Sequence, residues 1–195
     1  MEVWIEVNLV TRRELDRAVL LDVVDPLVHD ELADEIETWF FFWEPELRVR
    51  IRWLDPERAH ANRATLASTL DEATNARSVR RWYEGAHGEE GQTYVGEAEH
   101  YGAEAWPQIQ KDWMNGSELA LLLLKLEREG RLARPRDHHW QRHVHLFTNQ
   151  LFGSWEDEIE LCLRQAIGYI RLSGGPTREA RRLIAELQNL ERPSR

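Results

Sequence analysis

Three arginines alternate with apolar residues between positions 46 and 53, and their row is the part of the chain best suited to bind an anion. The three are Arg48, Arg50 and Arg52. Successive side chains of a strand point to opposite faces, so the guanidinium groups would share one face while the apolar residues meet a core. Guanidinium groups bind carboxylate or phosphate in bidentate fashion. The alternative is that the row pairs with acids of a neighbouring strand, such as Glu2 and Glu6.

A second group of residues suited to chemistry is the histidine-rich stretch at 138–145, followed by Asn149. On a helix, His139 and His143 share one face, and His145 shares another with Asn149. No further ligand at a recognisable spacing completes a metal site, so we expect none. A general acid or base is the better interpretation, because histidine has an unperturbed pKa near neutrality. A solvated run of surface histidines remains the alternative.

The third stretch runs from Tyr94 to Gly102 and carries Glu97 and Glu99. Strand alternation would put Tyr94 on one face and both carboxylates on the other. These three side chains are candidate substrate-binding residues together with Arg52 and Asn149. The alternative is an ordinary edge strand whose carboxylates neutralise the arginines. The glycines are too few and wrongly spaced for a phosphate-binding loop.

The elements that would position these residues form an α+β pattern. Strands are expected at residues 3–9, 39–43, 46–53, 78–84 and 92–98, and helices at 11–36 and 55–73. This order predicts a ferredoxin-like βαββαβ-type antiparallel sheet. From residue 103 the chain reads as helical, so we expect one domain over residues 1–195, with a sheet-rich half at 1–102 and a helical half at 103–195.

Local signals refine the expected helices. Thr11, with a glutamate three residues later, predicts a capping box. Pro26 is expected to kink or break the first helix, and Asp55 followed by proline predicts the entry of the second. A short helix is expected at 106–113, and Ser117 would cap the next one.

Composition excludes several classes of protein. A net charge of −10 disfavours a general nucleic-acid surface, so no direct nucleic-acid partner is expected. Cys162 is the single cysteine, which leaves no disulfide framework and no thiolate zinc site. Neither a signal peptide nor an apolar stretch of spanning length is present, so we expect a soluble cytoplasmic protein without membrane contact.

The order and spacing of these stretches resemble the C-terminal domain of the lantibiotic dehydratases, also found in thiopeptide biosynthesis proteins. Residues 46–51 resemble the family pattern His-Leu-Arg-Leu-Arg-Phe, and residues 94–102 resemble Tyr-Glu-Pro-Glu-x-Glu-Arg-Tyr-Gly. Residues 145–153 are similar to His-x-x-x-Asn-Arg-Leu-x-Gly. The resemblance runs from about Val3 to Ile170 and suggests a free-standing form of this domain.

The resemblance implies a role in making ribosomally synthesised, post-translationally modified peptides. In complete dehydratases, a large N-terminal domain glutamylates Ser or Thr using glutamyl-tRNA, and the C-terminal domain eliminates glutamate to leave a dehydroamino acid. By this resemblance Arg48 and Arg50 hold the departing glutamate, His145 transfers the proton and Asn149 orients it. Neither metal nor other cofactor is required. The expected partners are the leader and modified core of a precursor peptide and a separate glutamylating subunit, and a homodimer is compatible with the sequence.

Two alternatives remain open beside glutamate elimination. One is the [4+2] cycloaddition that forms a thiopeptide's pyridine ring, and the other is a noncatalytic subunit that binds the peptide. Glu46 stands in place of the family's usual histidine and Gln150 in place of its arginine. Loss of such cationic groups favours these alternatives over elimination. The predicted edge strand at 92–98 could bind an extended peptide by strand addition.

Overall fold

A computed structural model describes residues 2–43, 46–136, 138, 139, 142 and 182 of the chain. The chain divides into two compact units, Met1–Leu132 and Ala133–Arg195, of which the first is described almost completely. His145, Asn149 and the helices predicted around them lie outside the described residues. The single domain expected over residues 1–195 stays a prediction.

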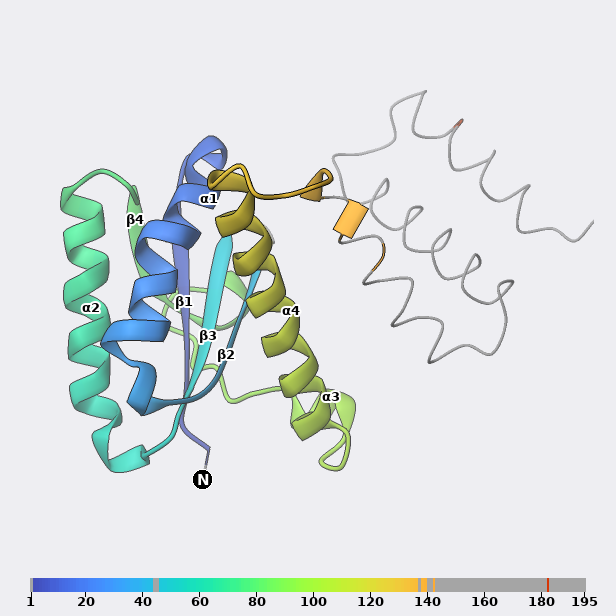
Figure 1. The fold of residues 1–195 in the computed structure, drawn as a ribbon. Helices are drawn as coiled ribbons and strands as arrows, with labels where there is room; N and C mark the ends of the chain where they lie inside the picture. The colour runs from blue at the N-terminus through green and yellow to red at the C-terminus, as the bar shows by residue number, and fades with distance from the viewer. Residues whose placement is uncertain (1, 44–45, 137, 140–141, 143–181, 183–195) are drawn as a thin grey trace, which may run out of the picture. The chain divides into compact units, whose positions relative to one another are not determined.

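The first unit combines an antiparallel sheet with helices (Figure 1). Its strands are β1 (Trp4–Val10), β2 (Ile36–Trp43), β3 (Leu47–Trp53) and β4 (Arg81–Glu84). Its α-helices are α1 (Asp16–Val19), α2 (Ala59–Asn75), α3 (Ala98–Tyr101) and α4 (Trp106–Arg128). The π-helical turns are η2 (Leu20–Val24) and η3 (Leu27–Glu31), and the 3-10 turns are η1 (Arg13–Leu15), η4 (Ala33–Glu35), η5 (Pro56–Arg58) and η6 (Ala86–Gly88).

The four strands lie in the order β2-β3-β1-β4, and every neighbouring pair is antiparallel. The predicted mixed class is therefore confirmed, with an antiparallel sheet and a chain that becomes mainly helical after it. The more specific ferredoxin-like assignment stays a prediction.

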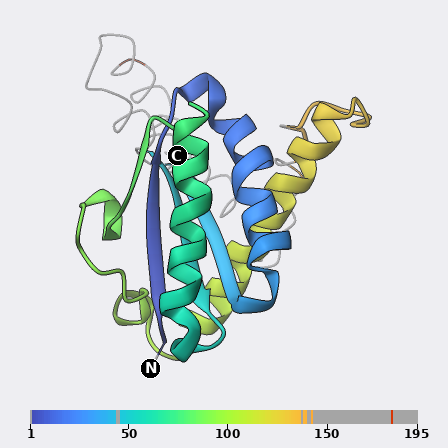
Figure 2. The ribbon, with the colours of Figure 1, turned by 90° about the vertical axis from the view of Figure 1, so that its left-hand side faces the viewer.

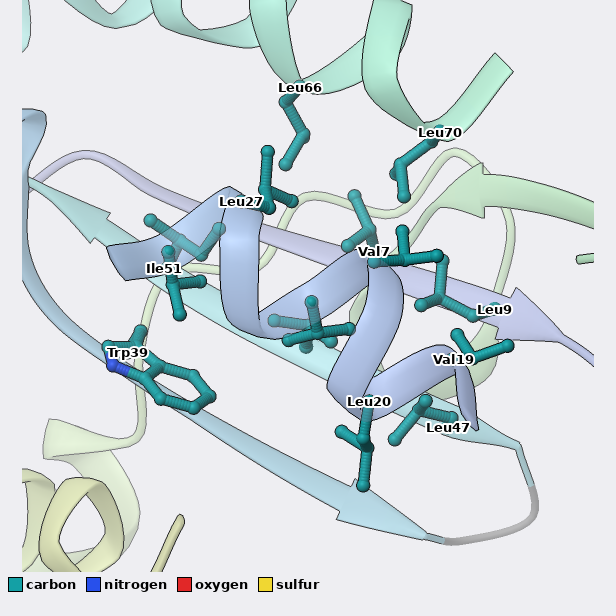
Figure 3. Packing of buried hydrophobic residues seen from close by; sticks show 14 of the residues in the cluster. Val7, Leu9, Val19, Leu20, Leu27, Trp39, Leu47, Ile51, Leu66 and Leu70 are labelled. Carbon is teal, nitrogen blue, oxygen red and sulfur yellow. The ribbon is translucent and has the colours of Figure 1, made fainter. Parts of the chain in front are cut away.

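One face of the sheet carries the main hydrophobic core. The register of β1 against β3 pairs Val7 with Val49 and Ile5 with Ile51, so apolar side chains of both strands point the same way. Figure 3 shows them packed against the helical segment after β1 and against α2. All the apolar residues predicted to face the core from β3 are buried there. Burial of such side chains supplies the main favourable free energy of folding.

The opposite face of the sheet is also covered. Its apolar cluster is centred on Trp4, Phe40, Tyr94 and Trp106. Two of these come from β1 and β2, while the others come from the loop after β4 and from the start of α4. Figure 2 shows this loop, in light green, on the opposite side of β1 from the helical segment that begins with α1. β1 is thus buried on both faces, whereas the sequence predicted a half-buried strand.

The strand predicted at residues 92–98 is not formed. Those residues are irregular until α3 begins at Ala98, and Gly96 has a φ of +84°. Tyr94 is buried, while Val95 is 76% exposed. The sequence alternation therefore does not mark a strand here. It reflects a segment that packs the ring of Tyr94 against the sheet and leaves Val95 in solvent. The edge proposed for strand addition is therefore absent at this segment.

The helical segment after β1 differs from the sequence prediction in two places, at Thr11 and at Pro26. The Thr11 hydroxyl bonds to Asp16, and no side chain caps η1, so the capping box is not formed. Pro26 has helical φ and ψ, and the chain continues through it to Glu31. The wide i to i+5 turns on either side leave room for the proline ring, whose missing N–H would break a regular α-helix.

Helix α4 is continuous where two helices were predicted. Ser117 lies in its middle, and its hydroxyl donates to the Trp113 carbonyl at 2.9 Å. The same oxygen accepts the backbone N–H of Phe41 in β2 at 3.1 Å. Ser117 therefore joins the helix to the sheet, and a hydroxyl satisfied in this way does not end a helix.

Helix α2 begins as the sequence predicted. Asp55 accepts the backbone N–H of Glu57 at 2.9 Å, and the proline after it opens the short turn η5. Leu66 and Leu70, one turn apart, then face the core.

Replacement of Leu66 should test the main core. Leu66 is fully buried, so Leu66→Ala is expected to lower the free energy of unfolding by about 2–5 kcal/mol through lost apolar burial and a cavity. Leu54 is 60% exposed, so Leu54→Ala should change the free energy of unfolding by less than about 0.5 kcal/mol. Urea unfolding followed by circular dichroism measures both, and equal effects would contradict this packing.

Candidate functional site

The arginine row lies at the centre of the sheet, on the face opposite the main core. Strand β3 is flanked by β1 and β2, and the register places Glu6 and Phe40 on either side of Arg50. Asn8 and Phe42 flank Arg48 in the same way. The predicted row is thus formed, and Glu6 of β1 stands directly beside it.

Arg50 is enclosed by hydrogen-bonding partners from three segments. Its Nε donates to Glu6 of β1 at 2.5 Å, and another of its nitrogens pairs with Glu97. A third nitrogen lies 3.4 Å from Nδ1 of His87 in the loop after β4. Arg50 is 2% exposed, so these groups take the place of water around its charge.

Aromatic rings complete the enclosure of Arg50. Its guanidinium carbon lies 4.2 Å from the ring centre of Tyr94 and 5.0 Å from that of Phe42. Burial alone would lower the pKa of Arg50, but Tyr94, Glu6 and Glu97 favour the charged form and raise the pKa above its usual value. Burial also raises the pKa of the Tyr94 hydroxyl, so the phenol stays neutral beside the cation.

The other two arginines differ in how far they are neutralised. Arg52 pairs with Glu2 at 2.5 Å and with Glu37 at 2.8 Å. Arg48 has only a distant pairing, 3.9 Å from Glu6, and its Nε has no hydrogen-bond partner among the described residues. The Arg48 side chain is 14% exposed. The Nε of Arg52 also has no partner among the described residues, so Arg48 differs from the other two arginines by having no close ion pair there.

The loop after β4 supplies contacts that the sequence reasoning did not anticipate. Its backbone reaches the site at Gly88, whose N–H donates to Glu6 at 3.3 Å and whose carbonyl accepts the Tyr83 hydroxyl at 3.0 Å. Asn8 of β1 donates to the Gly85 carbonyl at 2.7 Å. His87 has a φ of +55°, which is uncommon for a residue with a side chain. The glycines of this loop predicted a turn, but not the carboxylate that the turn would meet.

Five of the eight predicted site residues come together in the described structure. They are Arg48, Arg50, Arg52, Tyr94 and Glu97. Glu97 reaches Arg50 from the loop just before α3 and not from a strand. Glu99 is exposed and makes no ion pair with the part of the chain that the structure describes. His145 and Asn149 lie outside the described residues.

The charge balance on this face limits the anions it could bind. The three arginines meet four carboxylates, those of Glu2, Glu6, Glu37 and Glu97. Because Glu6 is fixed by Arg50 and by the Gly88 amide, it stays distant from Arg48. Arg48 is thus the least neutralised of the three guanidinium groups, while Arg50 positions Glu6 and Glu97.

Among the described residues, no three histidine, cysteine or acidic side chains are grouped so as to hold a metal ion. No described helix is both long and apolar enough to cross a membrane.

The sequence matches the family described as the C-terminal domain of lantibiotic biosynthesis dehydratases over residues 4–189. The match covers nearly the whole chain, so the protein belongs to this family. Membership points to the biosynthesis of lantibiotic-type peptides, which are made on the ribosome and then modified, and it implies a precursor peptide and a modification complex. No curated protein matches the chain.

The buried pair between Glu6 and Arg50 should matter far more than an exposed one. Glu6→Gln leaves the Arg50 charge without its main partner and is expected to cost about 3–5 kcal/mol of unfolding free energy. Glu2→Gln removes a partly exposed partner of Arg52 and should cost less than about 1 kcal/mol. Urea unfolding at neutral pH compares the two variants. Equal losses would show that Glu6 does not stabilise Arg50.

Proposed function

We propose that this protein eliminates glutamate from glutamylated Ser or Thr residues of a precursor peptide. The observation that carries the proposal is Arg48, a partly exposed guanidinium that lies 3.9 Å from Glu6 and has no closer ion pair among the described residues. The departing group is a carboxylate, which a guanidinium binds through two parallel hydrogen bonds. A cation at this position would stabilise the negative charge that develops as the bond breaks.

The proposed reaction needs one base and one cationic group. A base removes the proton from Cα, the electron pair forms the Cα=Cβ double bond, and the Cβ–O bond breaks to release glutamate. We assign proton removal to His145, with Asn149 orienting its ring, and both assignments come from the sequence motif. Histidine has a pKa near neutrality, as a general base requires. Arg48 would receive the glutamate carboxylate, and Arg50 would hold Glu6 away from it.

The remaining expectations belong to the same proposal. The substrate would be the modified core of a precursor peptide whose leader is also bound, and a separate subunit would attach the glutamate. The reaction as written uses neither metal nor cofactor. We expect it to take place in the cytoplasm, without direct contact with nucleic acid.

A second candidate is a noncatalytic subunit that binds the precursor peptide. It is favoured by the enclosure of Arg50, whose charge is already matched by Glu6 and Glu97 and surrounded by aromatic rings. Cycloaddition on a dehydrated peptide is the third possibility that the family resemblance leaves open, and it would be tested next if glutamate were retained.

Mass spectrometry of a glutamylated peptide from the pathway tests the proposal. The native protein should release glutamate, and His145→Ala should slow the release by about 10²–10⁴-fold because the base is lost. Arg48→Ala should slow it by about 10²–10³-fold, and Arg48→Lys should recover part of the rate because it keeps a charge without the bidentate fork. Arg17→Ala is the matched control, since Arg17 is an exposed arginine far from the row in sequence.

Two outcomes would separate the candidate functions. A peptide that remains glutamylated with native protein excludes elimination on that substrate. If Arg48→Ala and His145→Ala then bind the fluorescently labelled precursor as tightly as native protein does, the noncatalytic candidate is supported.

A further inference from the structure

His29 lies between two carboxylates that come from different parts of the fold. Its Nδ1 is 2.7 Å from Asp25, one turn earlier on the same helical segment, and its Nε2 is 3.0 Å from Glu118 of α4. An ionised carboxylate has only acceptors, so each ring nitrogen must carry a proton to make a hydrogen bond. An imidazole with two N–H groups is a cation. The geometry therefore requires the charged form of His29.

The charged groups around His29 balance the positive charge of its ring. Lys125 of α4 pairs with Asp25 at 2.8 Å, and the indole N–H of Trp39 donates to Glu118 at 2.9 Å. The Trp39 ring also meets the imidazole edge to face, with centres 5.6 Å apart. Two cations thus face two carboxylates. Loss of the His29 proton would leave one carboxylate without its donor and the group with a net negative charge.

We propose that His29 is a pH-sensitive clamp, which fastens α4 to the helical segment before β2 while it is doubly protonated and loosens α4 when it loses a proton. The clamp joins two segments that are far apart in sequence and that also meet through apolar contacts such as those of Leu121 and Leu124. Ion pairs of Lys125 with Asp25 and of Arg128 with Asp22 join the same segments, but neither of them titrates near neutral pH. The His29 side chain is 35% exposed, so solvent protons reach it.

Loosening of α4 would reach the candidate site. The N-terminal half of α4 carries Trp106 and Trp113, which pack on Trp4 and Phe40 over the face that holds Arg50. Ser117, next to Glu118, accepts the N–H of Phe41. The clamp therefore controls how firmly one wall of that face is held, and this inference does not depend on the reaction proposed above.

The direction of the pH effect follows from the two carboxylates. Burial lowers the pKa of His29, but hydrogen bonds to Glu118 and Asp25 outweigh it and raise the pKa above 6.5. A folded-state pKa above the unfolded one means that the clamp is complete below about pH 6.5. Its contribution is lost as pH rises through the raised pKa of the folded protein.

Nitrogen-15 NMR of the imidazole rings and hydrogen exchange of the full chain test the clamp. In native protein at pH 6.5, both ring nitrogens of His29 should be protonated. The signals of His29 are those that are absent from the spectrum of His29→Gln. The protection factor of the Phe41 amide, corrected for the intrinsic exchange rate, should fall about two- to fivefold as pH rises above the His29 pKa. His29→Gln should remove that fall, because glutamine cannot acquire the charge.

Two variants serve as controls for this experiment. His60→Gln, on the exposed side of α2, should leave the pH dependence of Phe41 protection unchanged. Glu118→Gln keeps the shape of the side chain but removes its charge, so the midpoint of the His29 titration measured by NMR should move to lower pH. A neutral His29 ring at pH 6.5 in native protein, or the same pH dependence in His29→Gln, would overturn the proposal.

Discussion

The pairing of β1 with β3 is the constraint on which the rest of the first unit depends. In this register Val7 faces Val49 on one side of the sheet while Glu6 faces Arg50 on the other. A slip of one residue would send every side chain of β1 to the wrong face. It would remove apolar side chains from the core and leave a buried guanidinium without its partner. Loss of apolar burial and loss of the ion pair thus both disfavour a shifted register. The ion pair therefore helps to specify the register as well as to stabilise the sheet.

A single helix connects the two apolar clusters of the unit. The second half of α4 places Leu121 and Leu124 in the main core, and its first half places Trp106 in the aromatic cluster on the opposite face. The arginine row lies beneath that aromatic cluster. Residues that we propose bind the substrate and residues that stabilise the fold are thus mixed within one layer, so a change in either affects the other.

The sequence predicted those features that depend on neighbours along the chain. Alternation located β3 and its two faces, and an aspartate followed by proline located the start of α2. Choices that depend on distant partners were missed. Residues 92–98 have the alternation of a strand but cover the sheet, and Ser117 resembles a helix cap but bonds to β2. Pairing with acids is observed for Arg50 and Arg52, while the binding of an anion by the row, at Arg48, stays a prediction.

The hydrogen bond between Ser117 and Phe41 also bears on how far the edge of the sheet is open to another chain. β2 is one of the two edge strands of the sheet, eight residues long and rich in aromatic side chains from Trp39 to Trp43. An open edge of this kind would be a template for pairing with another chain and the start of aggregates. Helix α4 lies along β2, and Ser117 takes up the Phe41 N–H that such a chain would otherwise use. The contact that attaches the helix thus also covers part of this edge.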